Sequence, residues 1–275
     1  MKNDVWYITG VTSGIGLGLA TVLLESGYKV AGTSRDMNKL IKIKTLIENP
    51  NFLPLQVDIT NVNNVNDSIE KTINCFGTLT TIVNNSGMGK IGAIEEVSNE
   101  DYKELFNCMY FGPLNVIKAA LPYFRKMKYG YIFNIGSVGG IKPVPYIGAY
   151  GSAKFALCGL SESLHYEVKK FNIKVSYVVL GAFATSITTD PNRFSKAIDG
   201  YNTLEELKKS FIKKYPGKSP FKLAEVLIRY GNQDEIPFNI MVGEAGLMKE
   251  VICNKINDLE CQYNTQIESN LNTDL

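Results

Sequence analysis

Residues 5–25 read VWYITGVTSGIGLGLATVLLE, in which an apolar strand pattern runs through a glycine-rich turn into a helix pattern. Gly10, Gly14 and Gly16 in this stretch have the spacing TGxxxGxG, which differs from the GxGxxG of other dinucleotide folds. Backbone amides at a helix N-terminus attract phosphate, and glycine lets a pyrophosphate approach them closely. The stretch therefore predicts a dinucleotide-binding turn, with a glycine-rich turn that binds no ligand as the alternative.

Strand-type apolar runs alternate with amphipathic helix patterns along the rest of the chain. The predicted strands span residues 5–9, 29–34, 52–57, 80–85, 130–135, 174–180 and 238–242. This alternation is typical of a parallel sheet with helices on both faces. We predict an α/β fold with a doubly wound parallel sheet of Rossmann type, arranged as a three-layer α/β/α sandwich.

The chain of 275 residues, 45% of them hydrophobic, is long enough to bury one large core. We expect a single domain over residues 1–262. Residues 185–220 mix polar and aromatic side chains and are predicted to form a lid over a substrate, whereas the polar residues 263–275 are expected to be a frayed tail. The net charge of +2 does not favour binding to nucleic acid or to an anionic membrane, so small molecules are the expected partners.

The cysteines are odd in number and scattered, and no two of them have the spacing of a metal knuckle or a redox pair. His165 is the single histidine and has no companion ligand, so we predict no metal site. The N-terminal residues run directly into the first strand, and no apolar run is long enough to span a bilayer. We therefore expect a soluble, cytoplasmic protein.

The second predicted strand ends at Ser34 and is followed by Arg35. An acidic residue at this point would bind a ribose 2′-hydroxyl, whereas an arginine can pair with a 2′-phosphate. The pair therefore predicts a preference for NADP(H), with NAD(H) also accepted. An exposed arginine without a ligand is the alternative.

Several motifs in unbroken order resemble the short-chain dehydrogenase/reductase family in its compact form. They extend over residues 4 to about 245 and comprise TGVTSGIG, VDIT with Asp58, NNSG at 84–87, NIGSVGG with Ser137, YGSAK with Tyr150 and Lys154, and GAFAT ending at Thr185. Tyr150 and Lys154 are four residues apart and share one face of a predicted helix. A surface pair is the alternative interpretation of that spacing.

The resemblance implies that Tyr150 is the general acid/base of ketone reduction, that Ser137 binds the substrate oxygen, and that Lys154 binds the nicotinamide ribose. Because a nearby cation favours a tyrosine anion, we also expect Lys154 to make Tyr150 more acidic.

The residues implied to bind the cofactor follow the ends of the predicted strands. Asp58 would lie on the adenine side, Asn84 would steady the central sheet, and Thr185 would hold the carboxamide, although each could instead be a cap, a strand end or a loop hydroxyl. The full predicted set is Gly10, Thr12, Ser13, Gly14, Ile15, Gly16, Ser34, Arg35, Asp58, Ile59, Asn85, Ser86, Gly87, Tyr150, Lys154, Gly181, Phe183 and Thr185.

The chain departs from the family pattern most clearly at Met109, where relatives usually have an asparagine of the proton relay. Methionine has no hydrogen-bond donor and cannot replace that side chain. Pro113 has no amide hydrogen, so it leaves the carbonyl of Met109 without its helical donor whatever the side chain is. Ser86 and Leu180, in place of a usual alanine and proline, are milder departures.

These observations predict an oxidoreductase that transfers hydride between NADP(H) and a carbonyl/secondary alcohol pair. The aromatic residues Phe183, Phe194, Tyr201 and Phe211 suggest a lipophilic substrate, although they could equally pack the lid. The resemblance implies a homodimer or homotetramer. The main alternative is a dinucleotide-binding sensor or interaction protein with impaired turnover, and sugar epimerase or dehydratase chemistry is a weaker one.

Overall fold

The computed structural model describes residues 4–142, 144–181, 191–202, 205–207, 209, 221–243 and 245–270. Within them, one seven-stranded sheet has the strand order β3-β2-β1-β4-β5-β6-β7, and all of its strand pairs are parallel. The strands are β1 (Val5–Thr9), β2 (Lys29–Ser34), β3 (Phe52–Gln56), β4 (Thr81–Asn84), β5 (Gly130–Ile135), β6 (Ile173–Leu180) and β7 (Asn239–Val242). The predicted doubly wound sheet is confirmed, and the strand ends differ from the predicted ones by no more than one residue.

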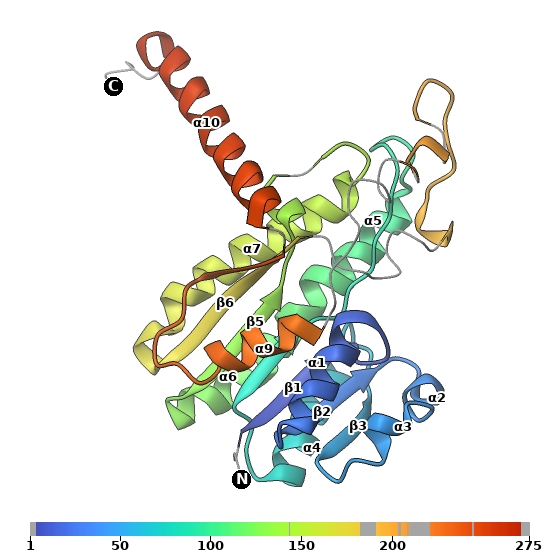
Figure 1. Ribbon diagram of the computed structural model, residues 1–275, viewed down its shortest axis with the longest axis vertical. Helices are drawn as coiled ribbons and strands as arrows, with labels where there is room; N and C mark the ends of the chain where they lie inside the picture. Colours follow the sequence, from blue (N-terminus) through green and yellow to red (C-terminus); the bar gives the residue numbers. More distant parts are fainter. Residues whose placement is uncertain are drawn as a thin grey trace.

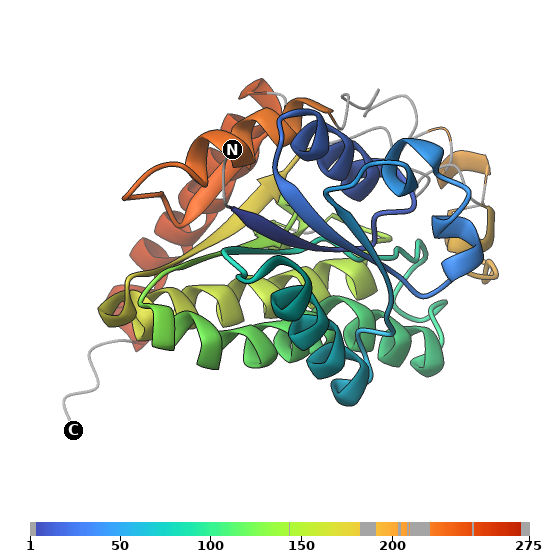
Figure 2. The same cartoon turned by 90° about the horizontal axis from the view of Figure 1, so that it is seen from below.

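Helices cover both faces of the sheet (Figures 1 and 2). One layer contains α1 (Gly14–Glu25), α2 (Met37–Leu40), α3 (Lys44–Ile47) and α9 (Phe221–Tyr230). The opposite layer contains α4 (Val62–Phe76), α6 (Gly112–Met127) and α7 (Gly148–Val168). The helix α5 (Asn99–Phe106) leads into α6 through a π-helical turn η1 (Asn107–Phe111), and short 3-10 turns lie at η2 (Val138–Gly140), η3 (Lys169–Phe171) and η4 (Pro191–Arg193).

The side chains of β1 show why its first four residues are apolar. Trp6 and Ile8 pack with α1 and α9, whereas Val5 and Tyr7 pack with α4, α6 and α7. Successive residues of a strand point to opposite faces, so a strand that is covered on both sides needs apolar residues at every position.

The predicted motifs meet at the carboxyl edge of the sheet. Gly10 follows β1, Arg35 follows β2, Asn85 follows β4 and Gly181 follows β6. The strand order reverses between β1 and β4, and open α/β sheets bind ligands at the carboxyl side of this reversal.

The final helix α10 (Ala245–Asn270) projects away from the sheet (Figure 1). Residues 263–270, expected from their polarity to be part of a frayed tail, continue this helix. Among the described helices, none is long and apolar enough to cross a membrane. The described residues also contain no cluster of three or more His, Cys, Asp or Glu side chains that could hold a metal ion.

Candidate active site

The glycine-rich turn is held from β4 by Asn85. The side-chain amide of Asn85 donates to the carbonyls of Thr9 and Gly10 at 2.9 and 3.0 Å. The backbone amides of Asn85 and Ser86 both donate to Oγ1 of Thr9 at 2.9 Å. Asn85, predicted to bind the cofactor, therefore has a side chain that braces the turn.

Glycine is required in this turn because the chain segments approach closely. Gly10 has φ +74°, and a Cβ atom there would lie 2.8 Å from Oγ of Ser86. A Cβ atom on Gly16 would lie 2.5 Å from Nδ2 of Asn85. Ser13 stands at the N-cap of α1 but makes no side-chain capping bond, so it leaves the first-turn amides of α1 uncapped. The turn is thus shaped to receive an anionic group on its backbone.

The residues predicted on the adenine side have different local roles. Ser34 is buried, and its hydroxyl donates to the carbonyl of Asp36 at 2.9 Å and accepts from the Asp36 amide at 3.1 Å. Arg35 is exposed at the end of β2. Oδ1 of Asp58 accepts from the amide and the hydroxyl of Thr60 at 2.9 and 2.8 Å, which is the local turn role that its alternative interpretation predicts. The next residue, Ile59, is buried.

The predicted catalytic residues come together from two elements. Tyr150 and Lys154 lie on α7, and Ser137 precedes η2 at the end of β5. The side chains of Ser137 and Tyr150 lie close together at Gly139, where a Cβ atom would be 3.5 Å from Oγ of Ser137 and 3.5 Å from Cε1 of Tyr150. Nζ of Lys154 is buried, donates to the carbonyl of Ile135 at 2.7 Å and lies 5.8 Å from the centre of the Tyr150 ring.

Burial has the largest effect on the pKa values of Tyr150 and Lys154. Burial raises the pKa of Tyr150 above its ordinary value, and the nearby Ser137 hydroxyl acts in the opposite direction with a smaller effect. Burial also lowers the pKa of Lys154 to about 8. The expectation that Lys154 makes Tyr150 more acidic is therefore not met in this structure. The reason is that desolvation of the phenolate outweighs the interactions that favour it.

The helix beside the catalytic group is irregular at Met109. The amide of Gly112 donates to the carbonyl of Asn107, five residues back, which defines the π-helical turn η1. In an α-helix the same amide would bond Cys108, and the next amide would bond Met109 but is missing in Pro113. Cys108 and Met109 therefore both lack the donor that a regular α-helix would supply to their carbonyls.

Part of the predicted lid is described. Residues 191–202 lie against residues 91–96: the carbonyl of Arg193 accepts from Ile91, and the amide of Ile198 donates to Glu96. Phe194 is buried against Ile91, so it packs the lid rather than lining an open pocket. Phe183, Thr185 and Phe211 lie outside the described residues.

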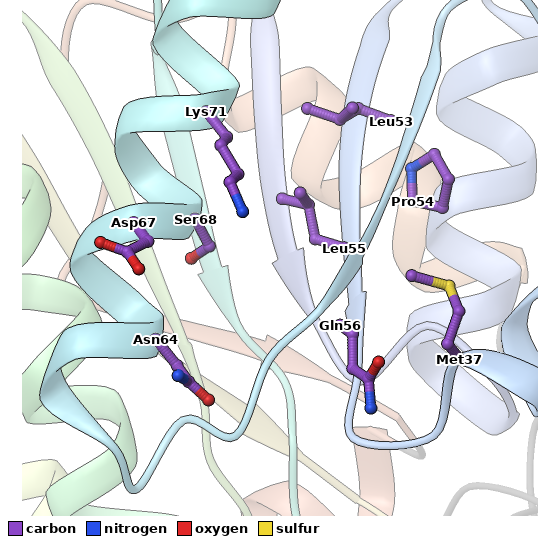
Figure 3. Close-up of a pocket in the computed structure, with 9 residues that line it drawn as sticks. All are labelled: Met37, Leu53, Pro54, Leu55, Gln56, Asn64, Asp67, Ser68 and Lys71. Carbon is purple, nitrogen blue, oxygen red and sulfur yellow. The ribbon is translucent and has the colours of Figure 1, made fainter.

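A hollow of about 530 Å³ lies away from this group, between the outer edge of β3 and α4 (Figure 3). Its lining comes from Met37, Leu53, Pro54, Leu55, Gln56, Asn64, Asp67, Ser68 and Lys71. None of these residues belongs to the predicted site, so the hollow is separate from the catalytic group.

Sequence reasoning missed two buried residues that support the site, Asn134 and Tyr177. Asn134 hydrogen-bonds Asn84 on one side and Ser161 of α7 on the other. Tyr177 contacts the backbone of both Ser137 and Lys154. Polar groups inside strands that are covered on both faces were the available signal, because such groups need partners when buried.

Comparisons with known proteins agree with this geometry. The sequence model of the family described as short chain dehydrogenase matches residues 4–195. A 3-ketodihydrosphingosine reductase of Bacteroides thetaiotaomicron is 36% identical over 252 residues, which cover 88% of this chain and 89% of that protein. Among solved structures, a short-chain dehydrogenase from Streptomyces avermitilis superposes with a TM-score of 0.86 at 26% identity, covering 99% of this chain and 98% of the other. The structure of ElxO with NADP bound has a TM-score of 0.72 at 26% identity and covers 88% and 96% of the two chains.

Proposed function

Because this chain belongs to the short chain dehydrogenase family, we propose that it transfers hydride between NADP(H) and a carbonyl/secondary alcohol pair, with Tyr150 as the general acid/base. The observation that carries the proposal is that the side chains of Ser137 and Tyr150 lie close together, beside the buried amino group of Lys154. These groups lie at the carboxyl edge of the sheet, on the same side as the glycine-rich turn.

The residues present fit a dinucleotide. Gly10 and Gly16 allow the turn to pack closely against Asn85 and Ser86, and the first-turn amides of α1 have no side-chain cap. These groups would hold the pyrophosphate, and Arg35 would pair with a 2′-phosphate. The nicotinamide supplies the hydride when it is bound.

The residues of this chain supply the proton and stabilise the charge that develops on the substrate oxygen. The raised pKa keeps Tyr150 protonated at neutral pH, as an acid that donates to a developing alkoxide must be. The Ser137 hydroxyl donates to the same oxygen and stabilises its charge. Lys154, held by the carbonyl of Ile135, places a cation beside this charge and would bind the ribose of the cofactor.

A buried apolar cluster packs against Tyr150, and we propose that the substrate is lipophilic. Tyr150 packs in a cluster that also contains Met88, Val97, Tyr102, Leu105, Phe106, Cys108, Met109, Ala149 and Ala153. The Bacteroides relative is named for a long-chain 3-keto substrate, so 3-ketodihydrosphingosine is the first compound to test. A panel of shorter ketones, assayed with both NADPH and NADH, should be less well reduced.

The decisive variant is Tyr150→Phe. It should retain NADPH binding, measured by fluorescence, while turnover falls by roughly 10²–10⁴ because a positioned acid is lost. Tyr263→Phe is the control, since Tyr263 lies on α10, away from this group, and is 55% exposed. Wild-type turnover in Tyr150→Phe would place the acid elsewhere in the protein.

An impaired sensor remains the second candidate because Met109 is fully buried and offers no donor for a proton relay. Such a protein would bind NADPH tightly yet oxidise none with any carbonyl. The cofactor-oxidation panel separates the two functions directly.

We also propose that the chain forms a homodimer or homotetramer through α6 and α7. Large apolar side chains are exposed on or next to these helices, namely Phe111, Met127, Phe155 and Tyr166. Light scattering at micromolar concentration should report at least a dimer, and a monomer would contradict this assembly.

A further inference from the structure

Tyr177 joins the two parts of the candidate site through one hydroxyl group. The residue lies on β6 and is fully buried. Its hydroxyl donates to the carbonyl of Lys154 at 3.1 Å and accepts from the amide of Ser137 at 3.3 Å. A single buried oxygen therefore contacts the backbone of both a predicted catalytic lysine and a predicted catalytic serine.

The backbone around Ser137 is matched to the Tyr177 ring. A Cβ atom on Gly136 would overlap this ring. A Cβ atom on Gly140 would overlap the Tyr177 hydroxyl and lie 3.0 Å from the carbonyl oxygen of Lys154. Glycine on both sides of Ser137 thus permits a close approach that any larger residue would prevent.

The two hydrogen bonds of Tyr177 require a neutral hydroxyl that donates and accepts at once. Burial raises the pKa of Tyr177, so the hydroxyl keeps its proton. The hydroxyl of Ser137 itself accepts from the amide of Gly139 at 3.1 Å. The amide of Ser137 is therefore fixed by Tyr177 and its side chain by Gly139, which orients the serine toward Tyr150.

We propose that Tyr177 is a positioning residue that acts through Ser137 and Lys154 to set the distance between the Ser137 and Tyr150 hydroxyls. This inference rests on the proposed function, in which those two hydroxyls bind the same substrate oxygen. The competing role is core packing alone, since the ring also contacts Leu157, Val179 and Met248.

The variant Tyr177→Phe separates the two roles because it keeps the ring and removes the hydroxyl. It should lower kcat and kcat/KM together by about tenfold, because a loosened serine stabilises the transition state less well. NADPH affinity should stay within about twofold of wild type, since Tyr177 is fully buried and its hydroxyl bonds backbone groups of the chain itself. Wild-type kcat in Tyr177→Phe would overturn the proposal.

Tyr7→Phe is the matched control. Tyr7 is also fully buried in the sheet, and its hydroxyl bonds Oγ of Ser68 at 2.7 Å, at a distance from the catalytic group. This variant should lose a similar amount of thermal stability while keeping wild-type kcat. Equal losses of kcat in both variants would mean that Tyr177→Phe acts through general destabilisation, which would overturn the positioning role.

A double-mutant cycle tests whether Tyr177 acts through Ser137. In a Ser137→Ala background, adding Tyr177→Phe should slow turnover by no more than about twofold, because the group being positioned is already absent. Independent, fully additive losses would contradict the proposal.

Hydrogen exchange gives a readout that needs no turnover. The Ser137 amide should exchange faster in Tyr177→Phe than in wild type and in Tyr7→Phe, because it has lost its acceptor. If the wild-type protein reduces no carbonyl, the proposed function fails, while an unchanged exchange rate at Ser137 would overturn the positioning role separately.

Discussion

Asn84 donates its side-chain amide to Oδ1 of Asn134 at 2.8 Å, across paired positions of β4 and β5. Asn134 in turn donates to Oγ of Ser161 at 2.8 Å, and Ser161 donates to the carbonyl of Leu157 at 2.6 Å. All three polar side chains are buried. The helix that carries Tyr150 and Lys154 is thereby hydrogen-bonded to the centre of the sheet, so its position depends on this chain of polar groups.

Asn134→Ala should lower the free energy of unfolding by about 2–3 kcal/mol, because it leaves the buried Asn84 amide without its acceptor and removes the donor to Oγ of Ser161. Chemical denaturation measures the loss. Asn66→Ala, at an exposed position of α4, is the control and should change the stability by less than about 0.5 kcal/mol. Similar values for the two variants would show that the buried chain contributes nothing specific.

Arg35→Ala should weaken NADPH binding by about tenfold and leave NADH binding within about twofold, because only NADPH has a 2′-phosphate for the guanidinium to bind. Arg35 is exposed, and the contact to it recorded in the structure is made at its backbone carbonyl by Nε2 of Gln56 at 3.2 Å. Its side chain can therefore be removed with little effect on the fold. Dissociation constants for both cofactors, in wild type and variant, check this. An unchanged ratio would exclude Arg35 as the discriminating residue.

The sheet could be predicted from sequence because each of its strands is apolar and bounded by polar turns. β1 is apolar at four successive positions since its two faces are both covered. The meeting of Ser137, Tyr150 and Lys154 could be anticipated from the family resemblance, and the structure places them together.

The features that escaped prediction depend on tertiary contacts. In the sequence Tyr177 resembles an ordinary strand residue, and only the structure shows that its hydroxyl bonds the backbone of both Ser137 and Lys154. The acidity of Tyr150 was misjudged because sequence spacing reveals the nearby lysine but not the degree of burial. The polar residues after 262 predict a frayed tail. A helix that projects from the sheet has no continuous apolar stripe, so its sequence lacks the periodicity from which a helix is predicted.

The pH dependence of reduction should report Lys154. Its pKa of about 8 means that the amino group is charged below this pH and becomes neutral above it. Tyr150 has a raised pKa and remains protonated across pH 7–9. We therefore expect kcat/KM for ketone reduction to be level below pH 8 and to fall as the pH rises through it.

Two variants test whether Lys154 causes the fall in kcat/KM above about pH 8, the alkaline limb of the profile. This limb should persist in the residual activity of Tyr150→Phe and be absent from Lys154→Met, each assayed where the protein remains folded. The contribution of Lys154 to stability changes with pH in the opposite direction to kcat/KM. Between about pH 8 and pH 10.5 the unfolded lysine keeps a proton that the folded one has lost, so the contribution of Lys154 to the free energy of unfolding rises with pH. A limb that survives in Lys154→Met would belong to another group.

The irregular turn at Met109 bears on the supply of protons to the site. Relatives use an asparagine to free a helix carbonyl, whereas here Pro113 has no amide hydrogen and the amide of Gly112 bonds Asn107. In this chain the backbone therefore frees a helix carbonyl, which an asparagine side chain does in the resembled family pattern. We infer that a relay water can still bind at this turn, although Met109 itself makes no contribution to it.

Met109→Asn should therefore change the rate of reduction by less than about tenfold, or under about 1.4 kcal/mol of barrier. Met109→Leu is the control: leucine is similar in size and has no hydrogen-bonding atom, so it should retain wild-type turnover in the buried cluster with Ala149 and Ala153. Steady-state kinetics with the best carbonyl check both variants. If wild type were inactive and Met109→Asn made it a competent reductase, the π-helical turn would not replace the missing side chain. The protein would then be better described as a dinucleotide-binding sensor.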